Sequence, residues 1–224
     1  MTPLKEIGEV LITVGEEDYF FRPSFINMTR IGEPEEIVQA LYDLHNDEAA
    51  ELMRKATVAL GYLPAWIADH CISPQYSKKA TVAAMTVLQA CSDQNVTSLT
   101  GEVVPGRSGK WTFVYRKGHM TPEEMIIVSR SLMAHGIVGK AKVRRLQRHE
   151  GAEASTEFNA FEYISAARTH LGMSREEAEQ LTMTDFQLLL AAKYPEQKGF
   201  TREEYEAAED AFLAKQARKQ GKQK

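Results

Sequence analysis

The sequence predicts a mainly helical α+β fold, with an N-terminal β-hairpin and a helical domain followed by a small C-terminal helical module. Three observations predict it. An alternating apolar run, a turn cluster and an aromatic run follow one another near the N-terminus. Apolar residues then recur at helical spacing through most of the chain. Proline-first helix starts and capping boxes recur between these stretches.

The composition agrees with a folded globular protein. Of the 224 residues, 43% are hydrophobic and 26% are charged. Two cysteines exclude a disulfide scaffold and fit a reducing compartment. The N-terminus lacks the apolar core of a secretory signal, and no apolar stretch approaches the ~20 residues of a membrane span. We therefore expect a cytoplasmic protein with no membrane partner.

The first element is expected to be a hairpin. Val10, Ile12 and Val14 alternate along one face of the run 7–14, and residues 15–18 are a turn cluster. Residues 19–22 are rich in aromatic side chains and suit the return strand. Pro23 ends the pairing because proline has no amide hydrogen to donate to a β-ladder.

Helices are expected from Gly32 onward. Pro34 opens the first helix, with acidic residues at its positively polarised end. Asp47 is the expected N-cap of the second helix, which Gly61 ends. A short apolar helix covers 64–71. The next helix restarts at Ser73-Pro74 and carries its apolar stripe on Ala80, Ala84, Val87, Leu88 and Cys91.

A second hairpin is expected next. Valines 103–104 and the alternating aromatic run 111–115 flank a turn-rich segment, 105–109. Thr121, with glutamate three residues later, is a capping box that begins another helix. Gly136 is the expected end of that helix, in the left-handed conformation that suits glycine.

A small, polar run at 151–156 indicates a domain boundary. It predicts an N-terminal α+β domain at 1–148, a linker at 149–157, a helical module at 158–214 and a basic tail at 215–224. In the module we expect one helix ended by Gly172, a capping box at Ser174, a helix stopped by Pro195 and a last helix from Thr201. The residues expected to face inward are Phe158, Phe161, Ile164, Ala167, Leu171, Phe186, Leu189 and Leu190.

No catalytic, metal or cofactor site is predicted. The sequence has no Cys-x-x-Cys pair, no His-Glu-x-x-His and no two histidines four residues apart on a helix. Asp69, His70 and Cys71 are consecutive, so their helical directions differ by about 100° and cannot converge on one ion. The loop 105–110 lacks the glycine and the hydroxyl of a phosphate-binding loop. We therefore expect no cofactor and no enzymatic activity.

The strongest charge feature is a basic segment at 140–148. It contains Lys140, Lys142, Arg144, Arg145 and Arg148, with no acidic residue among them. Three interpretations remain open: contact with nucleic-acid phosphates, contact with an acidic protein surface, or the solvated face of a helix. The net charge of −4 and the pI near 5.9 argue against a dedicated nucleic-acid-binding protein.

The C-terminal stretches 157–168, 172–179 and 181–195 resemble the C-terminal part of tail assembly chaperones of long-tailed, siphovirus-type bacteriophages. The hairpin that begins near Gly8 and leads into 21–25 is also similar to small phage tail proteins. The resemblance implies a non-enzymatic protein of the bacterial host cytoplasm. Such a chaperone keeps the tape measure protein soluble and recruits tail tube protein subunits.

The resemblance brings no site residue with it, so we select candidates from the sequence. For the tape measure protein they are Met125, Ile126, Leu132 and Met133, and for the tail tube protein they are Arg168 and Lys193. Self-association is also expected, because many copies must line a long client. The alternative is a nucleic-acid-binding regulatory protein that uses the segment 140–148 and the C-terminal helices.

Overall fold

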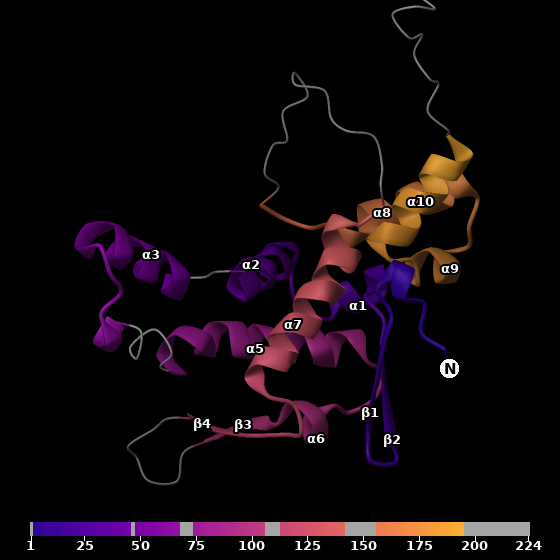
Figure 1. The fold of residues 1–224 in the computed structure, drawn as a ribbon. Helices are drawn as coiled ribbons and strands as arrows, with labels where there is room; N and C mark the ends of the chain where they lie inside the picture. The colour runs from indigo at the N-terminus through magenta and orange to yellow at the C-terminus, as the bar shows by residue number, and fades with distance from the viewer. Residues whose placement is uncertain (1, 46–47, 68–73, 106–112, 142–155, 195–224) are drawn as a thin grey trace, which may run out of the picture. The chain divides into compact units, whose positions relative to one another are not determined.

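The computed structural model describes residues 2–45, 48–67, 74–105, 113–141 and 156–194 (Figure 1). These residues form a mainly helical α+β fold with two separate two-stranded antiparallel sheets, which confirms the predicted fold class.

The N-terminal hairpin is confirmed. After a short 3-10 turn, η1 (Lys5–Ile7), strand β1 (Val10–Val14) pairs with β2 (Glu17–Phe21). Val14 lies opposite Glu17, so the loop has only two residues, and Gly15 takes a φ of 64°. A two-residue hairpin turn requires positive φ, which glycine adopts without a steric penalty.

A five-residue helix, α1 (Phe25–Thr29), follows the hairpin and was not expected from the sequence. Its N-cap is Ser24, whose hydroxyl accepts a hydrogen bond from the backbone amide of Asn27 at 3.4 Å. Phe25 and Met28 are fully buried. The helix is held by this burial, since so short a segment carries no periodic pattern of its own.

Three long helices build the main core. Helix α5 (Pro74–Cys91) packs against both α2 (Pro34–His45) and α7 (Pro122–Met133), and Figure 1 shows α7 crossing α5. Each helix contributes the apolar face that its sequence predicts. The fully buried side chains contributed by these helices include Leu44, Val87, Leu88, Met125, Leu132 and Met133.

Helix α3 (Glu48–Leu60) ends as predicted at Gly61, which takes a φ of 75°. A helical turn follows at 65–67. The expected N-cap Asp47 and the continuation to Cys71 lie outside the described residues.

The second hairpin is also confirmed. It consists of β3 (Glu102–Pro105) and β4 (Phe113–Arg116) and follows a short helix, α6 (Thr97–Thr100). At Gly101 the φ is +83°, and a Cβ atom there would lie 2.1 Å from the carbonyl oxygen of Arg116. Glycine therefore closes the base of the hairpin.

The capping box at Thr121 is present, but the predicted end of this helix at Gly136 is wrong. Helix α7 continues into a π-helical turn, η2 (Ala134–Val138), and Gly139 takes the positive φ of 78°. A Cβ atom at Gly136 would lie 2.8 Å from the sulfur of Met28. Glycine is needed there for close packing against α1, not to end the helix.

The C-terminal helices are α8 (Ala160–Ala166), continued by the π-helical turn η3 (Ala167–Leu171), then α9 (Arg175–Glu179) and α10 (Met183–Lys193). Gly172 and the Ser174 capping box lie where the sequence predicts. Phe161 and Leu189, both expected inside, are 62% and 38% exposed.

The predicted division between 1–148 and 158–214 is wrong for the described residues. Met1–Lys193 form one compact unit, and Tyr194 begins a second unit, Tyr194–Lys224, of which only Tyr194 is described. The ring of Phe25 stacks on Tyr163 at 5.7 Å and meets Phe186 edge-on at 6.0 Å. These aromatic contacts join the two expected domains into one hydrophobic core.

Two further expectations of the domain plan fall mostly outside the described residues. Of the expected linker 149–157, only Thr156 and Glu157 are described. The expected helix from Thr201 and the basic tail 215–224 are not described.

Candidate protein-binding surface on helix α5

Helix α5 has one face in the core and one face outside it. Ala84, Val87, Leu88 and Cys91 are at most 1% exposed. The outer face carries residues at the spacing of a single helical side. We call it the α5 surface, and its helix residues are Lys78, Val82, Met85, Thr86 and Gln89.

An apolar hollow of about 420 Å³ lies between α5, the β3–β4 hairpin and the start of α7. Val82 is 53% exposed and Val103 is 44% exposed on its two sides. Val103 is paired with Tyr115 across the hairpin, so both side chains point toward α5. The hollow is therefore lined by helix α5 and the β3–β4 hairpin, which are distant in the sequence.

The ring of Tyr115 is held in place by its hydroxyl, which donates a hydrogen bond to the carbonyl oxygen of Thr100 at 2.8 Å. Burial raises the pKa of Tyr115, while a backbone hydrogen bond involving Gly118 acts in the opposite direction. The hydroxyl is thus a neutral donor at physiological pH, and the ring is a fixed wall of the hollow.

A second hollow, of about 460 Å³, lies on the other side of Val82, between α2 and α5. Its apolar part includes Ile31 and Ala40, and its rim carries Asp43 and Lys79. Val82 lines both hollows, and so does Lys78. Val82 is therefore an exposed aliphatic ridge between two concave regions.

A third, polar hollow of about 670 Å³ lies near the C-terminal end of α5. Met85 lines both this hollow and the apolar hollow. Thr86 lines both this hollow and the hollow between α2 and α5. Arg30 donates to the carboxylate of Asp93 at 2.8 Å, and Gln89 donates to the carbonyl oxygen of Gln94 at 3.3 Å. The three hollows therefore form one continuous surface along α5.

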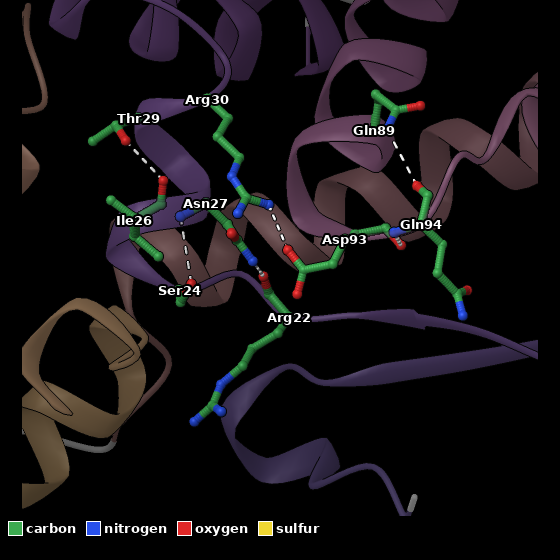
Figure 2. A network of polar contacts seen from close by, with 10 residues as sticks. Arg22, Ser24, Ile26, Asn27, Thr29, Arg30, Gln89, Asp93 and Gln94 are labelled. Atoms are coloured by element: carbon green, nitrogen blue, oxygen red, sulfur yellow. Dashed lines mark hydrogen bonds and ion pairs between the residues drawn. The ribbon is translucent and has the colours of Figure 1, made fainter. Parts of the chain in front are cut away.

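The polar network in Figure 2 attaches α1 to the end of α5. The side-chain amide of Asn27 donates to the carbonyl oxygen of Arg22 at 2.9 Å, and Arg30 reaches Asp93 from the end of α1. The side chains of Arg30 and Asp93 are 45% and 85% exposed. Solvent screens so exposed a pair, whose contribution to stability is about 0–1 kcal/mol.

A separate group of charged side chains joins the first hairpin to α10. Glu9 is only 6% exposed and accepts a hydrogen bond from the amide of Leu4 at 2.8 Å. The Nε atom of Arg22 lies 3.4 Å from Glu9. Burial raises the pKa of Asp185, Arg22 opposes that shift, and Glu9 adds to it. Glu9, Arg22 and Asp185 interact with one another, and none of them lines a hollow of the α5 surface.

The buried His135 also contacts α10. Its Nδ1 lies 2.9 Å from the hydroxyl of Thr184, which also accepts a hydrogen bond from the amide of Lys140 at 3.1 Å. Burial lowers the pKa of His135, and the charge of Lys140 lowers it further. The histidine therefore links η2 to α10 in its neutral form.

Three of the four predicted tape measure contacts are wrong. Met125, Leu132 and Met133 are fully buried on the face of α7 that packs into the core, so they offer no surface to a partner. Ile126 is partly buried against that core. The apolar spacing on this helix indicates burial within the chain, which the sequence cannot distinguish from burial against another protein.

The remaining predicted contacts lie elsewhere. Lys140, Arg168 and Lys193 are exposed, and Lys193 donates to the carbonyl oxygen of His170. Arg168 and Lys193 lie on η3 and α10, which pack together. Lys142, Arg144, Arg145 and Arg148 lie outside the described residues.

Sequence reasoning missed the α5 surface. The signal was the presence of Val82 and Met85 off the apolar stripe of their helix, on the side expected to be polar. The contribution of Val103 and Tyr115 could not be found in this way, because only the folded chain brings the hairpin to α5.

The buried Cys91 is a core residue, as expected. Burial raises the pKa of its thiol, and an inert structural cysteine follows. Within the described ranges, no three His, Cys, Asp or Glu side chains gather to hold a metal ion. None of the described helices is both long enough and apolar enough to cross a bilayer.

The comparisons with known proteins are limited to one family. No curated protein and no solved structure matches the sequence at a significant level. The profile of a family of unknown function (DUF6246) matches residues 21–207, a range that contains the whole α5 surface. The chain therefore belongs to the DUF6246 family.

Proposed function

We propose that this protein is a non-enzymatic assembly chaperone that holds a segment of a larger polypeptide on the α5 surface. The observation that carries the proposal is Val82, which is 53% exposed on a ridge between two hollows. Apolar side chains exposed beside concave regions are typical of protein-binding surfaces. The arrangement supports recognition of apolar side chains from another chain.

The binding mode that fits this surface is a helix lying in a groove. An amphipathic helix presents apolar side chains at positions i, i+3 or i+4, and i+7. Two of them would lie on opposite sides of Val82, one beside Val103 and Tyr115 and the other between α2 and α5. Each buried anchor of this kind contributes about 1.5–3 kcal/mol before the cost of association is subtracted. A few anchors therefore give the moderate affinity that a releasable chaperone needs.

We further propose, from the sequence resemblance, that the partner is a phage tape measure protein and that binding takes place in the bacterial host cytoplasm. A long apolar helical chain aggregates when its surface is bare, so covering it keeps it available for assembly. Recruitment of tail tube subunits would use a different surface, around the exposed Arg168 and Lys193. This division leaves the α5 surface for the client.

Co-expression with the tape measure protein tests the proposal. We expect the tape measure protein to become soluble and to co-purify with this chain. Val82→Asp should reduce the recovered tape measure protein at least about tenfold, because it places a charge on the apolar ridge. The matched control is Ile127→Asp on α7, since Ile127 is 66% exposed but lines none of the three hollows.

Two results would contradict the proposal. In one, the tape measure protein stays insoluble with the unmodified chain. In the other, Val82→Asp captures it as well as the control does. Circular dichroism of each variant confirms that the fold is retained.

The same proteins address the nucleic-acid-binding alternative. That function predicts salt-sensitive binding of duplex DNA that disappears in an Arg144→Ala, Arg145→Ala double variant. The chaperone proposal expects the double variant to capture the tape measure protein like the unmodified chain. DNA binding at moderate salt together with no client capture would favour the alternative.

A further inference from the structure

The N-terminal hairpin and helix α10 meet at a buried polar junction, whose residues line none of the three hollows of the α5 surface. His135 of η2 belongs to this junction and is buried. The backbone of Gly8 comes so close that a Cβ atom there would lie 2.4 Å from the Cβ of His135. The Nδ1 atom of His135 lies 2.9 Å from the hydroxyl of Thr184. The junction therefore brings residues 8–9 near residues 184–185.

Glu9 places a nearly buried carboxylate at this junction. Its Oε2 atom accepts a hydrogen bond from the amide of Leu4 at 2.8 Å, and its Oε1 atom lies 3.4 Å from the Nε atom of Arg22. The backbone of Arg22 is fixed independently, because its amide donates to the carbonyl oxygen of Cys91 at 2.8 Å. Figure 2 shows the side chain of Arg22 directed away from the polar network at Asp93. Arg22 is therefore the counter-ion of a buried carboxylate.

Asp185 brings a second carboxylate to the same guanidinium. It lies in the first turn of α10, next to Thr184, and α10 packs against η1 as well as η2. Burial raises the pKa of Asp185, the charge of Arg22 opposes that rise, and the charge of Glu9 adds to it. Asp185 thus has one attractive and one repulsive neighbour. Among these three groups one negative charge is left over when both carboxylates are ionised.

Helix α10 is buried at the end that carries Asp185. Met183 and Phe186 of its first turns are 4% and 6% exposed, whereas Leu188 and Leu189 further along are 45% and 38% exposed. The charges of the junction therefore act on the end of α10 that is packed into the core.

We propose that Glu9, Arg22 and Asp185 form an electrostatic latch between the N-terminal hairpin and α10, and that acid strengthens the latch by neutralising one of its two carboxylates. At neutral pH both ionised carboxylates depend on the single charge of Arg22. Once Asp185 is protonated it no longer repels Glu9, and Glu9 alone balances Arg22. The inference does not rest on the proposed function.

Other ionisable groups lie on α10 and on the elements that pack against it. The buried one is His135, and the exposed ones are Lys5, Glu6, Lys140, Arg168, His170 and Lys193. His135 acts in the direction opposite to the latch, because burial favours its neutral ring and that contribution is lost as the pH falls. Comparing variants that all retain His135 removes its contribution from the difference.

The sign of the latch effect follows from Asp185. Its folded pKa lies above its unfolded value, so its contribution to stability is present at low pH and is lost as the pH rises through the folded pKa. Arg22 limits the rise of this pKa. Arg22→Met keeps a long side chain but removes the charge, so the resulting loss should be large near neutral pH and small in acid.

Hydrogen exchange of the full chain at about pH 7 and about pH 4 tests the inference. In Arg22→Met the protection factors of β1, β2 and the first turn of α10 should fall at least about tenfold at pH 7 and should largely recover at pH 4. The amides of α5 are the internal reference. The matched control is Arg175→Met, since Arg175 pairs with Glu179 at 2.6 Å but is 69% exposed. It should change the protection at neither pH.

Asp185→Asn separates the charge of the latch from its packing. By itself it should leave the protection of the hairpin and of α10 unchanged or higher at pH 7, because it removes the surplus charge while Glu9 and Arg22 stay paired. Added to Arg22→Met, it should raise the protection at pH 7 at least about threefold above that of Arg22→Met alone, because Glu9 then faces no second carboxylate.

Three outcomes would overturn the inference. The first is an Arg22→Met chain that is equally weakened, or equally unfolded, at pH 7 and pH 4, which would mean that Arg22 acts through packing. The second is an Arg22→Met chain that behaves like Arg175→Met. The third is a loss of protection of tenfold or more in Asp185→Asn alone, which would mean that the junction needs the second charge. Client capture by the α5 surface is tested by other variants, so the two proposals fail separately.

Discussion

Helices α5 and α3 begin from similar sequence patterns and reach different environments. Both carry apolar residues at helical spacing. Helix α5 buries its stripe between α2 and α7, with Val87 and Leu88 fully buried. Helix α3 buries Ala56 against Ile67 and leaves Val58 79% exposed. An apolar stripe thus predicts that a helix needs a partner, and the tertiary structure decides whether the chain itself supplies one.

The difference also separates two roles. Helix α5 is anchored on one face, so its outer face is a fixed surface on which hollows can persist. The α3 segment has little anchoring among the described residues, where Ala56 and Ile67 are its buried side chains. We expect the α5 surface to be present in the isolated chain.

The largest expected effect compares the same substitution in the two helices. Leu88→Ala in α5 should lower the free energy of unfolding by about 2–5 kcal/mol, because it leaves a cavity in the main core. Leu60→Ala at the end of α3 should change it by less than about 0.5 kcal/mol in the monomer, since Leu60 is 51% exposed. Urea denaturation at low protein concentration measures both. Equal losses would break the comparison between the helices.

A smaller effect is expected from glycine substitutions. Gly136→Ala should lower the free energy of unfolding by about 1–3 kcal/mol, because its methyl group would meet Met28 at 2.8 Å and Pro23 at 3.1 Å. At Gly61 the added methyl group would have no neighbour within 4 Å. Gly61→Ala should therefore lower the free energy of unfolding by about 1 kcal/mol, from the backbone strain of its φ of 75° alone. The same denaturation experiment separates them. A larger loss of unfolding free energy for Gly61→Ala than for Gly136→Ala would contradict the open space around Gly61.

The smallest effect is a pH dependence in the main core. Burial lowers the pKa of His135 below its ordinary value of 6.5, so the folded protein favours the neutral ring. The resulting stabilisation is complete above the unfolded pKa and is lost as the pH falls through the lower, folded pKa. His135→Asn should therefore show less loss of stability than the unmodified chain between pH 7 and pH 5. Identical pH profiles would mean that the histidine is not buried in solution.

Local sequence signals predicted much of the fold. The two-residue turn at Gly15, the capping boxes at Thr121 and Ser174, and the helix end at Gly172 depend on neighbours within a few residues. Such features are settled by φ preferences and by nearby hydrogen bonds. For that reason these features can be predicted from the sequence.

The errors share a different cause. Met125, Leu132 and Met133 were expected at a partner surface, and a separate C-terminal module was expected beyond 158. The structure buries the first group and joins that region to the main core through the rings of Phe25 and Tyr163. Periodicity states which side of a helix is apolar and says nothing about which segment covers it.

By itself, the sequence determined the class of fold, the two hairpins and most helix boundaries, because these follow from short-range preferences along the backbone. Only the tertiary structure decided that Val82 stands between two hollows and that the apolar side chains around Trp66 remain uncovered. Burial is a property of contacts between distant segments. The placement of a binding surface therefore becomes visible only when those segments are brought together.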